Sequence, residues 1–139
     1  MFRPIARTSA VLVAALVIYG CSDDTPTAPS NPTPPTIITE VFTGPVTQNG
    51  GATHSFVTQA SGTVTAQLTA FSAPEGTRIG LALGTFNGSA CQLVITKDDA
   101  QLASSVTGAV SALGNLCVRI YDVGQLTQPA DYEIQVSHP

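Results

Sequence analysis

The sequence predicts an all-β protein, with a single antiparallel β-sandwich of about eight strands over residues 37–139. Three observations lead to this prediction. From Ile37 onward, apolar residues alternate with polar ones, which is the period of a half-buried strand. Turn-forming residues separate the alternating stretches, and no stretch has helical periodicity. Many short strands at this spacing favour two sheets packed face to face.

Residues 1–20 have the pattern of a bacterial secretory signal peptide. Two basic residues, Arg3 and Arg7, precede an apolar run over residues 10–19, and a small residue lies just before Cys21. The ten apolar residues of this run are about half of the ~20 that a membrane-spanning helix needs. We therefore expect the chain to be exported and the signal peptide to be cleaved.

The boundary Ile18-Tyr19-Gly20-Cys21 resembles the lipobox of bacterial lipoproteins, although a small residue is usual where Tyr19 stands. The resemblance implies cleavage before Cys21, diacylation of its thiol and acylation of the new amine, with palmitate among the acyl chains. Several acyl chains anchor a protein stably where one chain would not. Ser22 follows the cysteine, which resembles default sorting to the outer membrane, so we expect a lipid-anchored protein of the bacterial cell envelope, periplasmic or surface-exposed. The alternative is a plain secretory signal that happens to hold a cysteine.

Residues 21–36 are predicted to be the lipidated cysteine and a disordered Pro/Thr-rich linker. Ser22–Pro35 contains five prolines among Asp, Thr, Ser, Asn and Ala, and no large apolar residue that could pack. Such segments favour extended, polyproline-like conformations. At ~3.1 Å per residue, these fourteen residues would hold the domain roughly 40 Å from the acyl chains.

The clearest strand is Thr63–Ala70, where Val64, Ala66, Leu68 and Ala70 fall on one face and polar residues on the other. The other predicted strands are Glu40–Thr47, His54–Ala60, the alternations Ile79/Leu81/Leu83 and Cys91/Leu93/Ile95, Val106–Ser111, Leu116–Val123 and Asp131–Ser137. Turn signals separate them at Asn49-Gly50-Gly51, Ser61-Gly62, Pro74-Glu75-Gly76, Asn87-Gly88 and Gly114-Asn115.

Cys91 and Cys117 each lie on a predicted strand, and we expect them to form a disulfide between neighbouring strands. They are the two cysteines left once Cys21 carries lipid, and an exported chain meets oxidants. Their separation of 26 residues would restrain the unfolded chain by roughly 3–4 kcal/mol in the chain-entropy model. A metal or redox pair would need nearby histidines or CxxC spacing, and the sequence has neither. Buried free thiols would fit the same positions, so burial alone does not distinguish them from a disulfide. The oxidising compartment favours the disulfide.

Several stretches resemble the bacterial pre-peptidase C-terminal (PPC) domain. His54–Val57 followed by Ser61–Thr65 is similar to its opening, and Cys117–Asp122 and Asp131–Val136 are similar to its last two strands. The resemblance covers about Ile37–His138, with the disulfide as a variation on the general pattern. It implies a jelly-roll-like β-sandwich that serves exported proteins as a non-catalytic accessory or binding module.

Charge and motifs argue against two function classes. Removing residues 1–20 leaves three basic and nine acidic residues, a net charge of −6, so nucleic-acid binding lacks its electrostatic footprint.

No GxSxG or HExxH motif occurs. His54 and Ser55 are neighbours on a predicted strand, so their side chains point to opposite faces. His138 lies next to the last residue, where we expect little order. We predict no enzymatic activity.

No cofactor is predicted, and calcium is the one alternative. Asp98 and Asp99 follow the strand that is predicted to end near Thr96, and Asp122 ends another strand. Calcium needs several oxygens that converge from loops. This stretch lacks the alternating Asp spacing of a calcium loop, and adjacent carboxylates often do no more than keep a loop solvated.

Two functions from different classes remain. One is a membrane-anchored lipoprotein that presents a non-catalytic β-sandwich to a protein or glycan partner, with a calcium-stabilised binding domain as a variant. The other is a structural envelope lipoprotein without a discrete ligand. An exposed aromatic cluster would favour the first, and Phe71 and Phe86, each near a predicted turn, are the aromatic residues outside core-like positions.

The lipobox resemblance gives the first testable prediction. Cys21→Ser removes the thiol that would be acylated, so the variant should take up no labelled palmitate, whereas the wild type should be labelled. Ser22→Ala, which changes the adjacent residue and keeps the thiol, is the matched control and should stay labelled. An unlabelled wild-type protein would contradict the lipoprotein reading.

Overall fold

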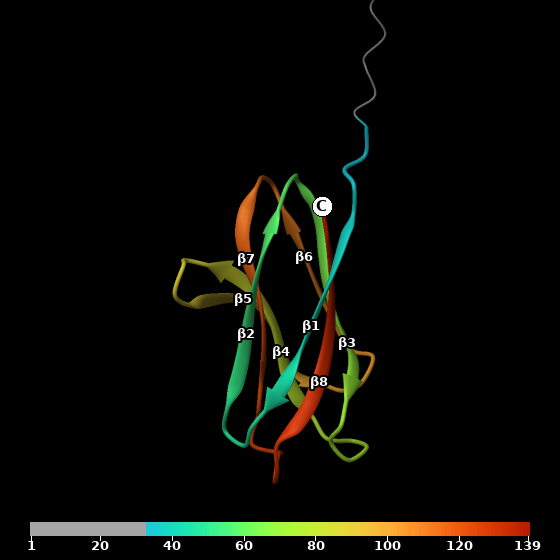
Figure 1. Cartoon of the computed structure of the whole chain (residues 1–139), viewed down its shortest axis with the longest axis vertical. Helices are drawn as coiled ribbons and strands as arrows, with labels where there is room; N and C mark the ends of the chain where they lie inside the picture. Colours follow the sequence, from blue (N-terminus) through green and yellow to red (C-terminus); the bar gives the residue numbers. More distant parts are fainter. Residues whose placement is uncertain (1–32) are drawn as a thin grey trace, which may run out of the picture. The chain divides into compact units, whose positions relative to one another are not determined.

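The computed structural model describes residues 33–139, in which Thr33–Pro139 form one compact all-β unit (Figure 1). The strands are β1 (Ile38–Val46), β2 (Gly51–Thr58), β3 (Gly62–Phe71), β4 (Ile79–Phe86), β5 (Cys91–Ala100), β6 (Ser105–Val110), β7 (Gly114–Tyr121) and β8 (Ala130–His138). The prediction of a β-sandwich of about eight strands is confirmed. The predicted signal peptide, Cys21 and the linker as far as Pro32 lie outside the described residues. Among residues 33–139, no helix is long and apolar enough to cross a membrane.

The eight antiparallel strands form two four-stranded sheets with the topology of a jelly roll. The first sheet has the order β1-β8-β3-β6, and the second has the order β2-β7-β4-β5. Six of the seven connections between consecutive strands carry the chain from one sheet to the other, because only β4 and β5 lie side by side in one sheet. The β4–β5 hairpin projects to the left in Figure 1.

The core lies between the two sheets and follows the alternation of the sequence. On β3, Val64, Ala66 and Leu68 are buried as predicted, whereas Ala70 is exposed because a register shift after Leu68 reverses the alternation. Replacing a buried Leu or Ile by Ala typically costs about 2–5 kcal/mol. The largest fully buried apolar side chains of the core are Leu68, Ile79, Leu81, Ile120, Ile134, Val46, Val64, Val118 and Val136.

The edge strand β5 departs from the predicted alternation. Its pairing with β4 shifts between Ile95 and Leu93, so these two residues do not share a face. Ile95 packs against the core, whereas Leu93 is 41% exposed. The strand also runs on to Ala100, so the prediction that it ends near Thr96 is wrong.

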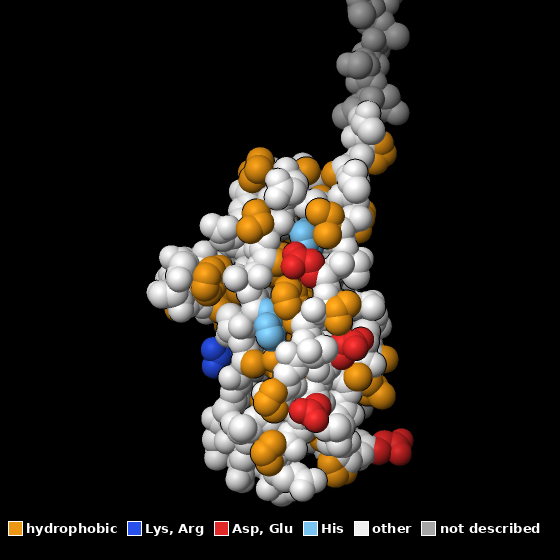
Figure 2. Space-filling view, viewed as in Figure 1, with side chains coloured by type: hydrophobic (Ala, Val, Ile, Leu, Met, Phe, Trp, Pro, Cys, Tyr) orange, Lys and Arg blue, Asp and Glu red, His pale blue; other side chains and the backbone are white. Residues whose placement is uncertain are grey.

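Aromatic and histidine side chains pack at the seam between β1 of the first sheet and β2 of the second. The two histidines are the pale blue side chains in Figure 2. His54 on β2 stacks on Phe42 of β1, with ring centroids 4.8 Å apart. A hydrogen bond of 2.7 Å joins His54 Nε2 to the hydroxyl of Tyr132 on β8. His54 therefore points between the sheets, away from Ser55, which is exposed.

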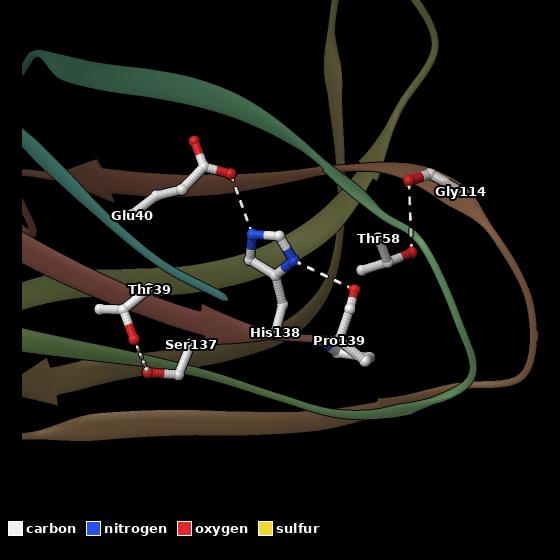
Figure 3. Close-up of polar contacts among 7 residues, drawn as sticks. All are labelled: Thr39, Glu40, Thr58, Gly114, Ser137, His138 and Pro139. Atoms are coloured by element: carbon white, nitrogen blue, oxygen red, sulfur yellow. Dashed lines mark hydrogen bonds and ion pairs between the residues drawn. The ribbon is translucent and has the colours of Figure 1, made fainter. Parts of the chain in front are cut away.

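The second histidine of the seam, His138, is ordered and 1% exposed, so the expectation of little order there is wrong. Its Nε2 lies 2.9 Å from Glu40 Oε1, and its Nδ1 lies 3.3 Å from the carbonyl oxygen of Pro139 (Figure 3). The same oxygen of Pro139 accepts a hydrogen bond from the backbone N–H of Gln59 (2.8 Å). Pairing of β8 with β1 and β3 thus fixes the backbone at this end of the chain.

The seam predicts a pH dependence of stability. Burial lowers the pKa of His54 below its ordinary value of 6.5, because the charged ring would lose water. The unfolded chain therefore takes up this proton at a higher pH than the folded protein does. The stability that His54 contributes is complete above about pH 6.5 and falls as the pH drops through that value toward the lower folded pKa.

His54→Gln keeps a polar group for Tyr132 but does not titrate, so this part of the decline should disappear. Urea unfolding at about pH 8 and about pH 5 measures the free energy of unfolding of both proteins. All other titrating groups are shared by the two proteins and cancel in the comparison. An equal loss of stability in wild type and variant would show that His54 stays uncoupled from folding.

Candidate functional site

The outer face of the second sheet brings together residues from all four of its strands, and we call it the Arg119 face. The strand registers arrange its side chains in rows across the sheet. The rows are Gly51–Tyr121–Gly80, then Thr53–Arg119–Ala82–Thr96, then Ser55–Cys117–Gly84–Leu93. Most positions in these rows carry small side chains, so the larger side chains of Arg119 and Tyr121 lie among them.

The disulfide crosses β4 on this face. The structure pairs Cys91 of β5 with Cys117 of β7, in agreement with the sequence prediction, but these strands are not hydrogen-bonded neighbours because β4 lies between them. The two Cα atoms are 5.8 Å apart, well short of the roughly 9.6 Å of two strand spacings. The start of β5 therefore folds over β4, and Cys117 is completely buried beneath it.

Gly84 makes this crossing feasible. It pairs with Cys117 on one side and with Leu93 on the other. A Cβ at residue 84 would lie 3.0 Å from the Leu93 Cα and still closer to the carbonyl group of Gln92. Only a residue without a side chain lets the β5 backbone come this close.

A second contact between β7 and β5 crosses β4 four residues further along β7, at Tyr121. Tyr121 on β7 pairs with Gly80 on β4, and its hydroxyl donates a hydrogen bond to Asp98 Oδ1 on β5. The ring must therefore lie across β4, where a Cβ on Gly80 would collide with it. Burial, together with the Asp98 carboxylate, raises the pKa of Tyr121 to about 12, so the hydroxyl remains a donor at neutral pH.

Arg119 lies between the two crossings, in the row of Thr53 and Thr96. Its Nη1 donates to Thr53 Oγ1 at 3.4 Å, which is a long hydrogen bond. Within residues 33–139 no carboxylate lies within 4.0 Å of its guanidinium, since the contacts of this length between basic and acidic side chains are Lys97–Asp99 and His138–Glu40. A guanidinium has five N–H donors, so most of its hydrogen-bonding capacity is directed at solvent.

Asp122 organises the rim of the face. Its Oδ2 accepts the backbone N–H of Asn49 (2.8 Å), and its Oδ1 accepts the N–H groups of Gly124, Gln125 and Leu126 at 2.9–3.1 Å. Burial would raise the pKa of Asp122, but the hydrogen bonds from these four backbone N–H groups outweigh it and lower the pKa. The carboxylate thus fixes the β1–β2 turn against the loop after β7.

A hollow of about 470 Å³ opens over this part of the face. That volume falls within the ~300–1,000 Å³ of small-molecule sites, although the hollow is open to solvent. Its lining includes Asn49, Gly51, Cys91, Leu93, Arg119, Tyr121 and Asp122. The arrangement offers a cation, an aromatic ring that passes over Gly80 and an apolar wall made by the disulfide and Leu93.

The three candidate calcium ligands, Asp98, Asp99 and Asp122, do not converge. Asp98 and Asp99 lie within β5, and Asp98 binds the hydroxyl of Tyr121. Asp99 pairs with Lys97 at 3.0 Å, and the hydrogen bond and charge of that lysine lower the pKa of Asp99. Asp122 binds backbone N–H groups, as described above. In the part of the chain that the structure describes, no group of three His, Cys, Asp or Glu side chains is arranged to hold a metal ion.

A larger hollow, of about 580 Å³, lies over β1, β8 and the end of β3. Several of its polar groups are paired within the domain. The hydroxyl of Thr69 donates to Glu133 Oε1 (2.8 Å), and Ser72 Oγ accepts the backbone N–H of Asp131 (2.7 Å). Phe71 lines this hollow and is partly buried, as is Phe86 at the end of β4, so the two form no exposed aromatic cluster. We therefore place the candidate site at the Arg119 face.

The disulfide crossing predicts the effect of a side chain at residue 84. Gly84→Ala sets a methyl group against the backbone of Gln92 and Leu93, which cannot rotate away, so the free energy of unfolding should fall by about 1–3 kcal/mol. Gly114→Ala is the matched control, because a Cβ there has no neighbour nearer than 4.0 Å. Guanidinium unfolding of the oxidised proteins measures both. Equal stability of the two variants would contradict the crossing of β5 over Gly84.

No protein-family model matches this chain, and no curated protein matches it either. The jelly-roll fold is shared by domains of unrelated function, so the topology alone assigns no activity. The residues of the Arg119 face therefore carry the functional argument.

Proposed function

We propose that the protein is an exported bacterial lipoprotein, anchored in the cell envelope through acyl chains on Cys21, whose β-sandwich binds a protein or glycan partner without catalysing a reaction. The lipobox resemblance and the Pro/Thr-rich linker support the anchored, extended presentation. The resemblance to PPC domains supports an accessory or binding role in place of catalysis.

The single observation that carries the binding role is the state of Arg119. Its guanidinium lies in a hollow on a sheet face, with one long hydrogen bond and no carboxylate within 4.0 Å among the described residues. An arginine held by a carboxylate has its guanidinium donors occupied within the protein, often in a bidentate pair. Asp98 and Asp122 lie nearby, but each is engaged elsewhere, so the domain leaves this cation available to a partner.

The alternative of a structural lipoprotein without a ligand accounts for the disulfide and the closed seam, since both stabilise the sandwich. It gives no reason for a cation in an open hollow. The packing of His54 on Phe42 and its hydrogen bond to the Tyr132 hydroxyl support a structural role for this histidine.

Photo-crosslinking in living cells tests the binding role without assuming the chemistry of the partner. p-Benzoylphenylalanine placed at Thr96, an exposed position in the row of Arg119, should form adducts with the partner. The same amino acid placed at Gln135, exposed on the other sheet, is the matched control and should form none. Adding Arg119→Gln should abolish the adducts at Thr96. The adducts are measured as a mass shift of the purified protein.

Two outcomes would contradict the proposal. Adducts that form from Gln135 and not from Thr96 would place the partner on the first sheet. A complete absence of adducts from Thr96 would leave the Arg119 face without a partner and favour the structural alternative.

A further inference from the structure

We infer that the Arg119 face recognises an acidic sugar, with the guanidinium of Arg119 binding the carboxylate of a uronic acid and the ring of Tyr121 supporting the pyranose. This inference rests on the binding role proposed for the same face. It follows from three properties of the face: its charge, its fully hydrogen-bonded backbone and its hydroxyl groups.

The charge of the face points to a carboxylate. Arg119 is the cation in the hollow, and its planar fork matches a carboxylate in a bidentate manner. The acidic neighbours do not satisfy it, because Asp122 accepts four backbone N–H groups and Asp98 accepts the Tyr121 hydroxyl. Those two carboxylates would repel a densely charged polyanion, so the fitting ligand carries few, well-separated carboxylates.

The backbone N–H and C=O groups of β7 are already hydrogen-bonded to the neighbouring strands, which argues against a peptide ligand. An extended peptide binds most readily at a sheet edge, where free N–H and C=O groups can pair with it. Arg119 and Tyr121 lie on β7, which is paired with β2 on one side and β4 on the other. A peptide laid over this face would lose water from its own backbone and find no backbone partners.

The side chains around Arg119 suit the hydroxyl groups of a sugar. Thr53 is the neighbour of Arg119 in its row, Thr96 lies beyond Ala82 in the same row, and Ser55 lies in the next row. A hydroxyl both donates and accepts, as sugar hydroxyls do. The ring of Tyr121 passes over Gly80 to reach Asp98 and lines the hollow, so it offers an aromatic surface to the C–H groups of a pyranose. In a uronic acid the carboxylate is attached directly to the ring, so both contacts can form at once.

A matched pair of ligands tests the inference. Methyl β-glucuronide and methyl β-glucoside differ only in a carboxylate against a hydroxymethyl group. Saturation-transfer NMR, on the mature protein in a detergent without a sugar headgroup, should show that the glucuronide binds at least tenfold more tightly. Arg119→Gln should abolish that preference, and Arg119→Lys, which keeps the charge without the fork, should reduce it in part. Arg78→Gln, outside the hollow, should leave it unchanged.

A second variant keeps the test valid if Arg119→Gln is poorly folded. Thr96→Glu places a carboxylate across Ala82 from Arg119, where it should compete with the ligand and lower the affinity for the glucuronide at least tenfold. Thr96→Gln has the same size without the charge and should bind as the wild type does.

The inference is overturned if the glucuronide does not bind, if both sugars bind equally, or if the preference survives Arg119→Gln. A capped Gly-Glu-Gly peptide that binds as tightly as the glucuronide would also overturn it, in favour of an acidic peptide. Adducts at Thr96 without any preference for the glucuronide would sink the sugar chemistry and leave the binding role standing. If Thr96 forms no adducts and the glucuronide is not preferred, both the binding role and the sugar inference are wrong.

Discussion

The structure depends on the way in which β5 is held across β4. The Cys91–Cys117 disulfide and the Tyr121–Asp98 hydrogen bond both join β7 to β5 over a strand that lies between them. Each crossing passes a glycine, Gly84 or Gly80, and neither could form over a side chain. An edge strand is ordinarily the weakest part of a sheet and a template for pairing with other chains. Here two contacts from an inner strand hold it, and they fold its first residues onto the outer face.

This constraint also makes the candidate site. The residues that let β5 cross leave a floor of small side chains, and Arg119 lies on that floor between the two crossings. The disulfide and Leu93 form one wall of the hollow, and the turn held by Asp122 forms its rim. Because the crossings fix Tyr121 and Cys117, the side chains flanking Arg119 are positioned before any ligand arrives, which lowers the entropic cost of binding. In the proposed function, the acyl chains and the linker present this preorganised face away from the membrane.

Much of the fold could be predicted from the sequence, and the site could not. Period-two alternation marks each of the eight strands, and the compartment implied by residues 1–20 leads to the disulfide. The sequence does not reveal which strands become neighbours: the disulfide predicts that β5 and β7 are adjacent, whereas β4 separates them in the sheet. Register shifts in β3 and β5 broke the alternation at Ala70 and Leu93, and no local signal marks them. Arg119 belongs to no motif, because its significance comes from the absence of a carboxylate partner in space.

The most direct test of the account is the state of Cys91 and Cys117 in the exported protein. Alkylation under denaturing conditions, before and after reduction, followed by intact-mass measurement, counts the free thiols. The account predicts that neither cysteine is alkylated without reductant and that both are alkylated after reduction, within a monomeric chain. Alkylation of both without reductant would mean that β5 is not bridged to β7, and the Arg119 face would lose the constraint that builds it.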